Sequence, residues 1–447
     1  MRVIFVNPPS PFLIQDRGAP ALGILYLAAI LRQHDYEVAC WDLTGDARLA
    51  DLFGGAQVLT QDRSLLLGAA KAIPGEFFGG GETLWAITAT SAQYHEAVNL
   101  RHAITVRAPH AKVIIGGSHV SALPDEALRD GFHAVIVGEA DDFLVDWLDQ
   151  GGPVGIHHST APRDLDRLPF PARDLIDLGS YCANLTVGEG AATTIHASRG
   201  CPWQCAYCLR ELGDKARIYR PRSVVNVIAE LDEIYETYGI RRFTFTDDVF
   251  GLRRPWLQEF CTQVKDHGYH FRCNIRTNYL YHECLPAMYE AGFRAISFGV
   301  ESADDGILEY ISKNTVALNT KAILACREAG IAAKCYFLWG LPGDGRDSAE
   351  KLKRFVEDVR PDSAQVATLI PLPATPLFRQ ATAMGFVPDY SQLYHNGKNG
   401  KSGDLWLPWW TEETLALRDE LLAWIEGHYA QPQPAVQCPN ALSATEA

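Results

Sequence analysis

The stretch TTIHASRGCPWQCAYC, residues 193–208, begins as an apolar strand and runs into a loop that carries three cysteines. Cys201, Cys205 and Cys208 are separated by three and then by two residues. Three thiolates on one loop could hold zinc or an iron–sulfur cluster, or they could be ordinary buried thiols. Their position at the end of a strand, next to a glycine and a proline, favours a site over three scattered core residues.

The number of cysteines separates the two metal readings. Structural zinc normally takes four protein ligands, and the loop supplies no fourth cysteine or histidine. Cys182 and His196 are near in sequence, so a more distant fourth ligand stays open. A 4Fe–4S cluster held by three cysteines keeps one iron open for a small-molecule ligand, which is a catalytic arrangement.

The rest of the chain places this loop in a β/α fold. From residue 191 onward, apolar strands alternate with segments of helical spacing six times, which predicts a barrel or partial barrel of the TIM type. In such a barrel the chemistry lies at the carboxyl ends of the strands. The expected strands cover residues 193–199, 241–248, 270–278, 295–302, 332–343 and 363–373.

A separate β/α series precedes the barrel. Its continuous apolar strands predict a doubly wound, Rossmann-like parallel sheet, which binds ligands at the carboxyl ends of its strands. Those ends carry candidate residues Asn7, Gly116, Gly117, Ser118 and Glu139. The expected strands cover residues 2–7, 37–43, 83–91, 112–117 and 134–139.

Composition and boundaries complete the outline. A net charge of −14 over 447 residues argues against a general binder of nucleic acid or anionic membranes. Without a signal peptide or an apolar run long enough to span a bilayer, we expect a soluble, cytoplasmic protein. The expected parts are the doubly wound domain (1–150), a linker (151–190), the barrel (191–385), a cap segment with one helix (386–430) and a disordered tail (431–447).

The cysteine loop resembles a known signature. CPWQCAYC is similar to the CxxxCxxC motif of the radical SAM superfamily, with the aromatic Tyr207 before the last cysteine. The resemblance implies that Cys201, Cys205 and Cys208 hold a 4Fe–4S cluster whose open iron is chelated by S-adenosylmethionine (SAM). Reductive cleavage of SAM then gives a 5′-deoxyadenosyl radical, which abstracts hydrogen from an unactivated carbon.

The ends of two further strands also resemble this family. The resemblance implies that Asp247 and Asp248 hold the methionine ammonium group, although both could instead cap a helix. Glu301 and Ser302 lie in a segment similar to the family's ribose-binding segment, where a carboxylate accepts sugar hydroxyls.

Arg276 and Asn278 end the third expected barrel strand and lie at the predicted mouth. Arg276 could pair with the SAM carboxylate. Alternatively, it could pair with Asp247 or Glu301 and only shape the pocket.

The stretches IIGGSHVSALPDEAL and AVIVGEADD resemble the cobalamin-binding-type domain found ahead of many radical SAM barrels. The DxHxxG motif, whose histidine ligates cobalt in other cobalamin proteins, is missing from the sequence. This fits a domain that binds cobalamin without a protein imidazole, and equally one that binds nothing. His119 is interpreted as a structural loop residue.

Two reaction outcomes follow from the resemblance. The first is cobalamin-dependent C-methylation of a small molecule, of the kind found in antibiotic and other natural-product biosynthesis. The second is cobalamin-independent radical dehydration, rearrangement or epimerisation, such as 1,2-diol dehydration of an aminoglycoside-type sugar, with Glu211 or Tyr219 as the general acid. A non-catalytic cluster carrier would have no use for acidic residues around the open iron. The expected electron donor is a flavodoxin or ferredoxin.

The aromatic segment over residues 405–410 has two interpretations. It could cap the pocket and stack on a planar or sugar substrate. Packing of the last helix onto the barrel is the favoured interpretation.

Overall fold

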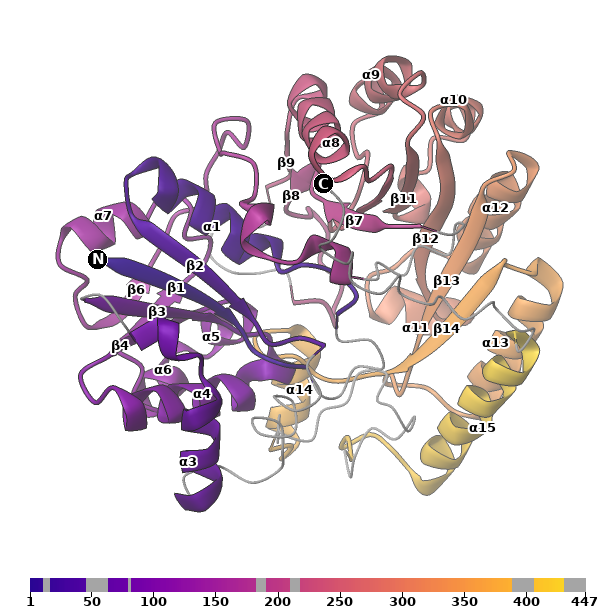
Figure 1. The fold of residues 1–447 in the computed structure, drawn as a ribbon. Helices are drawn as coiled ribbons and strands as arrows, with labels where there is room; N and C mark the ends of the chain where they lie inside the picture. Colours follow the sequence, from indigo (N-terminus) through magenta and orange to yellow (C-terminus); the bar gives the residue numbers. More distant parts are fainter. Residues whose placement is uncertain are drawn as a thin grey trace.

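The computed structural model describes residues 1–10, 17–45, 63–78, 82–181, 190–209, 218–387 and 406–429. Figure 1 shows two parallel β-sheets, each with its own helices. The predicted general acid Glu211 and the predicted tail over residues 431–447 lie outside the described residues. Within the described ranges, every helix is too short or too polar to cross a membrane.

The first sheet has six parallel strands in the order β2-β1-β3-β4-β5-β6. The winding direction reverses between β1 and β3, which is the switch point where doubly wound sheets bind ligands. This confirms the predicted fold class. The strands are β1 (Arg2–Asn7), β2 (Glu37–Asp42), β3 (Thr83–Thr88), β4 (Lys112–Gly116), β5 (Ala134–Val137) and β6 (Gly155–His158).

Helices cover both faces of the first sheet, which explains why its inner strands β1, β3, β4 and β5 are mostly apolar. In β1, Val3 and Phe5 pack in the core of one face, and Ile4 and Val6 pack in the core of the other. Helices α1 (Leu22–Gln33) and α7 (Leu144–Asp149) cover the first of these faces. The opposite face is covered by α3 (Arg63–Ala72), α4 (Tyr94–Arg107), α5 (Ser118–Ala122) and α6 (Pro124–Arg129).

The second sheet also has six parallel strands, in the order β14-β13-β12-β11-β10-β7. Among the described strands β7 and β14 are the two edges and do not pair with each other, so the sheet is the predicted partial barrel. The strands are β7 (Ala192–Ile195), β10 (Arg242–Phe245), β11 (His270–Asn274), β12 (Phe293–Glu301), β13 (Ala332–Trp339) and β14 (Ser363–Thr368).

A large aromatic core joins the second sheet to its helices. Phe243, Phe245, Phe271 and Phe293 point to the helical side and are at most 1% exposed. The helices that follow the strands are α8 (Val224–Tyr238), α9 (Arg254–Val264), α10 (Leu285–Glu290), α11 (Asp305–Tyr310), α12 (Val316–Glu328), α13 (Arg346–Val359) and α14 (Pro376–Ala383).

Two elements differ from the sequence-based expectation. Strand β6 extends the first sheet with residues from the segment expected to be a linker. The strand expected over 193–199 is divided into β7 and a short strand β8 (Ser198–Arg199), which pairs antiparallel with β9 (Arg220–Pro221). This hairpin flanks the cysteine loop.

The C-terminal aromatic segment packs onto the barrel, as the favoured interpretation predicts. Leu407 is fully buried and Trp410 is buried in a cluster with residues of α11 and α14. The indole N–H groups of Trp409 and Trp410 both donate to the carbonyl oxygen of Gly340, each over 2.8 Å. The segment leads into α15 (Glu412–Tyr429), which lies beside β14 and α13 (Figure 1).

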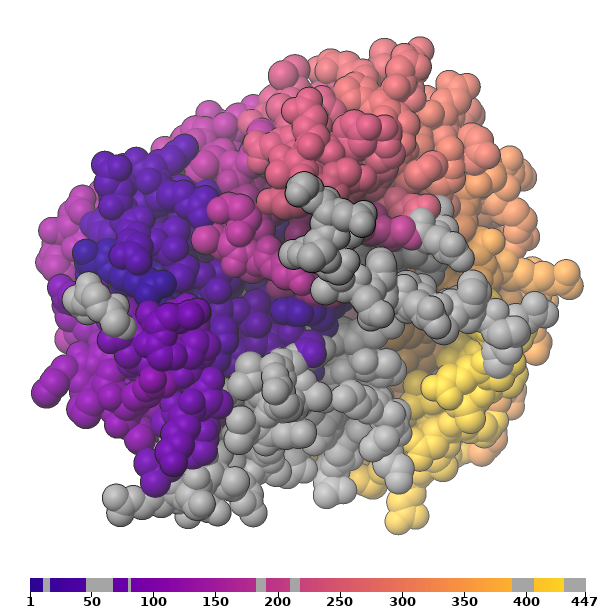
Figure 2. All heavy atoms as spheres, in the orientation of Figure 1, coloured from indigo at the N-terminus to yellow at the C-terminus, as the bar shows by residue number. Residues whose placement is uncertain are grey.

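The two halves of the molecule are in direct contact. Figure 2 shows the indigo and purple surface of the first sheet and its helices meeting the magenta surface of the residues that begin the second half. The connecting segment takes part in this contact, since the amide of Ala172 donates to the carbonyl oxygen of Leu25 in α1 over 3.0 Å.

Candidate functional site

The cysteine loop lies across the carboxyl ends of the barrel strands and is bonded to the barrel on two sides. The amide of Ala206 donates to the carbonyl oxygen of Ile311, over 3.1 Å. The carbonyl oxygen of Ala206 accepts from the amide of Leu377 at the start of α14, also over 3.1 Å. These bonds hold the middle of the loop at the barrel mouth, where the chemistry of such folds takes place.

The three cysteines share this loop but their sulfur atoms are not gathered around one point. Cys205 is buried, and Cys201 and Cys208 are half-buried. Among the residues that the structure describes, no three Cys, His, Asp or Glu side chains are arranged to hold a metal ion. The donor set itself fits an iron–sulfur cluster, because it consists of three soft thiol ligands on one short loop. The ligand role of the three cysteines stays a prediction.

Arg276 contacts the cysteine loop. Its guanidinium group donates to Sγ of Cys205 over 3.1 Å and to the carbonyl oxygen of Ser312 over 2.9 Å, and it lies 4.4 Å from the ring centre of Trp203. Within the described part of the chain, Arg276 therefore does not form the alternative pair with Asp247 or Glu301.

Glu301 ends β12 at the mouth and is almost fully buried. Its Oε1 accepts a hydrogen bond of 2.6 Å from the hydroxyl of Tyr207 and lies 3.1 Å from Nζ of Lys313. Its second oxygen, Oε2, has no protein partner among the described residues. Burial and the Glu301 carboxylate together raise the pKa of Tyr207 well above its usual value, so the phenol stays protonated and donates.

The backbone at Glu301 is strained. Its φ of +67° is in the left-handed region, which is rare for a residue with a side chain. The pairing of β12 with β13 shifts register between Gly299 and Glu301. A Cβ at Gly299 would lie 2.3 Å from Oε1 of Glu301 and 2.9 Å from Nζ of Lys313. The register shift sets the backbone direction at Glu301, and the missing side chain at Gly299 leaves room for the Glu301 carboxylate at the barrel mouth.

Asp247 and Asp248 have different surroundings. The Asp247 carboxylate is buried and accepts from the amide of Ala197 over 2.9 Å and from the hydroxyl of Ser198. Burial raises the pKa of Asp247 to about 7, against the opposing effect of these two bonds. Asp248 is exposed. The alternative that these residues cap a helix is wrong, because α9 begins after Arg253.

Asn278 and Ser302 lie close in sequence to the ends of β11 and β12, and we call the loops that follow these two strands, with Glu301 and Lys313, the rim of the barrel mouth. The side-chain oxygen of Asn278 accepts from the side chain of Asn314 over 3.2 Å. The Ser302 hydroxyl accepts from the amide of Asp304 over 3.2 Å, and Asp304 caps α11. Both residues thus stabilise the loops that follow β11 and β12.

Tyr219, the second predicted general acid, precedes β9 and is half-buried. Burial raises its pKa to about 12, while hydrogen bonding to Ser198 acts in the opposite direction. It lies beside the Ser198–Asp247 pair.

A pocket of about 300 Å³ lies at the carboxyl ends of the first sheet. Of the residues predicted to bind a ligand at these strand ends, Gly116 and Gly117 line the pocket, whereas Asn7 and Ser118 do not, and the ligand role itself stays a prediction. Gly117 has a φ of +105°, and a Cβ there would lie 2.6 Å from the carbonyl oxygen of Ala89, so only glycine fits. We call this the interdomain pocket, because His196 of the second half also lines it.

Asn7 and His119 have structural partners. Asn7 donates to Asp42 over 3.1 Å and accepts from Gln93 over 3.2 Å. His119 is fully buried, stacks on Tyr94, and its two ring nitrogens contact Ser91 and Glu126.

Sequence reasoning missed several residues of these sites. Lys313 of the rim and Tyr26, Arg199 and Asp141 of the interdomain pocket were not candidates, and His196 was considered only as a possible distant fourth metal ligand. The ring of His196 is parallel to that of Tyr26, with centroids 6.5 Å apart, and burial lowers its pKa to about 3. His196 is therefore a neutral imidazole at neutral pH.

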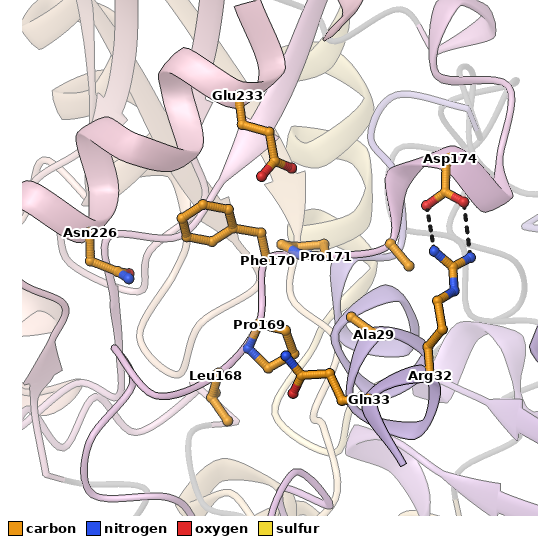
Figure 3. Close-up of a pocket in the computed structure, with 11 residues that line it drawn as sticks. Ala29, Arg32, Gln33, Leu168, Pro169, Phe170, Pro171, Asp174, Asn226 and Glu233 are labelled. Atoms are coloured by element: carbon orange, nitrogen blue, oxygen red, sulfur yellow. Dashed lines mark hydrogen bonds and ion pairs between the residues drawn. The ribbon is translucent and has the colours of Figure 1, made fainter. Parts of the chain in front are cut away.

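A second, open groove of about 650 Å³ lies between α1, the connecting segment and α8 (Figure 3). None of the predicted site residues lines it. Arg32 and Asp174 form an exposed two-bond ion pair at its edge. The groove lies outside the candidate site.

Comparison with known proteins agrees with this arrangement. The family model of the Radical SAM superfamily matches residues 195–356. An uncharacterized methyltransferase from Pyrococcus horikoshii is 28% identical over 410 residues, which cover 86% of this chain and 83% of that protein. Cytidylyl-2-hydroxyethylphosphonate methyltransferase from Streptomyces wedmorensis is 25% identical over 458 residues, which cover 88% and 84%.

Among solved structures, the radical S-adenosylmethionine methyltransferase TsrM from Kitasatospora setae, with cobalamin and a 4Fe–4S cluster bound, aligns with a TM-score of 0.61. The identity is 17%, and the alignment covers 86% of this chain and 78% of that one. This likeness shows a shared two-part fold.

Proposed function

We propose that this chain, an enzyme of the radical SAM superfamily, uses cobalamin to methylate an unactivated carbon of a small molecule. One observation carries the proposal. The interdomain pocket is next to the start of the cysteine loop, because Arg199 lines the pocket and lies two residues before Cys201. Two cofactors held at these places would be neighbours. The relatives named as methyltransferases support the same reaction.

The cluster would be held by Cys201, Cys205 and Cys208, and it supplies the electron that cleaves SAM, while cobalamin supplies the methyl group. The protein's part is to bind and orient. Arg276 fixes the loop through Cys205 and Ser312. A cation close to the sulfur atoms also offsets the negative charge of thiolate ligands.

SAM would lie against the rim at Glu301. Oε2 of Glu301 is available to accept from a ribose hydroxyl, and Tyr207 and Lys313 hold the other oxygen in place. The Asp248 carboxylate is exposed, whereas the Asp247 carboxylate is buried and both its oxygens already accept bonds from Ala197 and Ser198. Asp248 is therefore favoured over Asp247 for binding the methionine ammonium group.

The interdomain pocket would hold one part of cobalamin, since it is too small for the whole molecule. Glycines at the ends of β4 and β5 let a ligand approach the backbone closely. Its walls are mostly apolar, as expected for a pocket that takes a large organic group. His196 is neutral there and would add no charge against the ligand.

The radical dehydration alternative is not favoured. An effective general acid has a pKa near the working pH, and a pKa of about 12 makes the Tyr219 phenol a weak acid at neutral pH. The small-molecule substrate, a flavodoxin or ferredoxin as electron donor, and a cytoplasmic location belong to the proposal.

The first test is anaerobic reconstitution of the full chain with iron, sulfide and hydroxocobalamin, followed by desalting and absorption spectroscopy. We expect about four irons per chain together with a corrin band. Cys205→Ala should lose the cluster absorption, whereas Cys40→Ala, at a half-buried thiol in β2 of the first sheet, should keep it. Iron without corrin in the wild-type protein would contradict cobalamin-dependent methylation.

A further inference from the structure

Two arginines face each other in the hairpin that flanks the cysteine loop. Arg199 of β8 and Arg220 of β9 are cross-strand partners. Like charges directly opposite each other destabilise paired strands. Their side chains are only 17% and 6% exposed, so water screens this repulsion poorly. The hairpin therefore depends on acidic groups from elsewhere in the chain.

Those acidic groups come from the first half of the molecule. Glu139, just after β5, has its Oε2 2.9 Å from Arg199 and 3.2 Å from Arg220, and its Oε1 also accepts from Arg220. Asp141 binds Arg199 through both oxygens, over 2.9 and 3.2 Å. Two carboxylates thus balance two guanidinium groups. We call these four residues the arginine–carboxylate cluster.

This cluster touches both parts of the candidate site. Glu139, Asp141 and Arg199 line the interdomain pocket, and the guanidinium group of Arg199 also lies 4.9 Å from the ring centre of Tyr26. On its other side, Arg199 is separated from Cys201 only by Gly200, which has a φ of +84°. The start of the cysteine loop is therefore tied to the N-terminal sheet by charge-assisted bonds.

We propose that the arginine–carboxylate cluster positions the cysteine loop. The N-terminal half of the chain would thereby set the conformation in which the three thiols hold the 4Fe–4S group. This inference rests on the proposed function in one respect: the cysteine loop must bind the 4Fe–4S group. The physical reason is that removal of one partner leaves a buried charge uncompensated, which strongly destabilises its surroundings. Glu139 has the central place, because it is shared by both arginines.

The test compares Glu139→Gln and Arg199→Lys with Arg32→Gln in the full chain. Arg32→Gln is the matched control, because it breaks an exposed ion pair with Asp174 at the edge of the open groove, which none of the predicted site residues lines (Figure 3). Two quantities are measured: hydrogen–deuterium exchange over residues 197–209 without cofactors, and the electron paramagnetic resonance spectrum of the reduced cluster after reconstitution.

In Glu139→Gln we expect exchange in this segment to be about tenfold faster and the spectrum to change. Arg199→Lys should be intermediate, because lysine keeps the charge but cannot bond two oxygens in a fixed fork. Arg32→Gln should match the wild-type protein in both measurements.

Wild-type exchange and an unchanged spectrum in Glu139→Gln would overturn the proposal. If Glu139→Gln does not fold, as judged by circular dichroism, Arg199→Lys decides by the same two measurements. A wild-type protein that assembles no cluster would contradict the proposed function instead, and the exchange comparison without cofactors would still decide the positioning role.

Discussion

The hydroxyl of Tyr207 donates a hydrogen bond of 2.6 Å to Oε1 of Glu301 and so joins the cysteine loop to the end of β12. Nζ of Lys313, 3.1 Å away, shares the same oxygen. One carboxylate thereby receives support from the loop proposed to hold the cluster and from the rim proposed to hold SAM. The two ligands would be aligned through this contact.

Tyr207→Phe should weaken SAM binding. A hydrogen bond to a buried charged group contributes about 1.5–3 kcal/mol, so we expect the dissociation constant of SAM to rise about tenfold or more. Titration calorimetry on anaerobically reconstituted protein measures this. Tyr310→Phe removes a hydroxyl that bonds to Gln380 on the surface, and it serves as the control. Equal SAM affinity in both variants would remove Tyr207 from the site.

Gly299→Ala should displace the Glu301 carboxylate by a direct steric contact. The added methyl group would collide with the ends of the Glu301 and Lys313 side chains, which can move without unfolding the protein. We expect normal folding but a SAM affinity about tenfold lower, a cost of about 1.4 kcal/mol. Gly427→Ala is the control, because nothing lies near its Cβ and alanine should stabilise α15 by about 1 kcal/mol. SAM binding at wild-type strength in Gly299→Ala would show that the position of Glu301 is unimportant.

The alternation of strands and helices in the sequence predicts both sheets. It does so because the helices next to each strand in the chain pack on the sheet and bury its apolar side chains. Strand β6 is missed for a local reason: its four residues GIHH follow two glycines and a proline and carry two histidines. Strands β8 and β9 have two residues each, too few for any periodicity.

In the candidate site, too, some residues could be predicted from the sequence and others could not. The ligand loop and Glu301 are readable because they follow strands within short motifs. Lys313 reaches Glu301 only because the loop and α11 fold back over the strand end. The bonds between Arg199 and Glu139 depend on how the two halves dock, which no pattern of neighbouring residues encodes.

Glu96 should make the stability of the protein depend on pH. Its side chain is fully buried in α4, and neither carboxylate oxygen has a partner among the described residues. Burial raises the pKa of Glu96 from 4.5 to about 8. Between these values the folded protein keeps a proton that the unfolded chain has lost, so the free energy of unfolding falls as the pH rises through this window and is unaffected below it.

Glu96→Gln should remove that dependence. Near pH 9 the wild-type protein should be less stable than the variant by on the order of 4 kcal/mol, with a much smaller difference at pH 4. Urea unfolding followed by circular dichroism at several pH values measures this, and Glu37→Gln, at an exposed carboxylate, is the control. Parallel stability curves for wild type and Glu96→Gln would mean that the carboxyl group finds a partner or water.

Trp410 should anchor the C-terminal segment to the barrel mouth. It is 5% exposed, packs in the cluster that Tyr207 also contacts, and donates to the carbonyl oxygen of Gly340. Trp410→Ala should cost about 3–5 kcal/mol of unfolding free energy in urea, because a large buried ring is lost and a cavity remains. Trp410→Phe should cost less, since the neighbouring Trp409 still donates to the same oxygen. Trp406→Ala, at a half-exposed ring, should change stability little. If the Trp406 and Trp410 variants were equally stable, the C-terminal segment would not be held by Trp410.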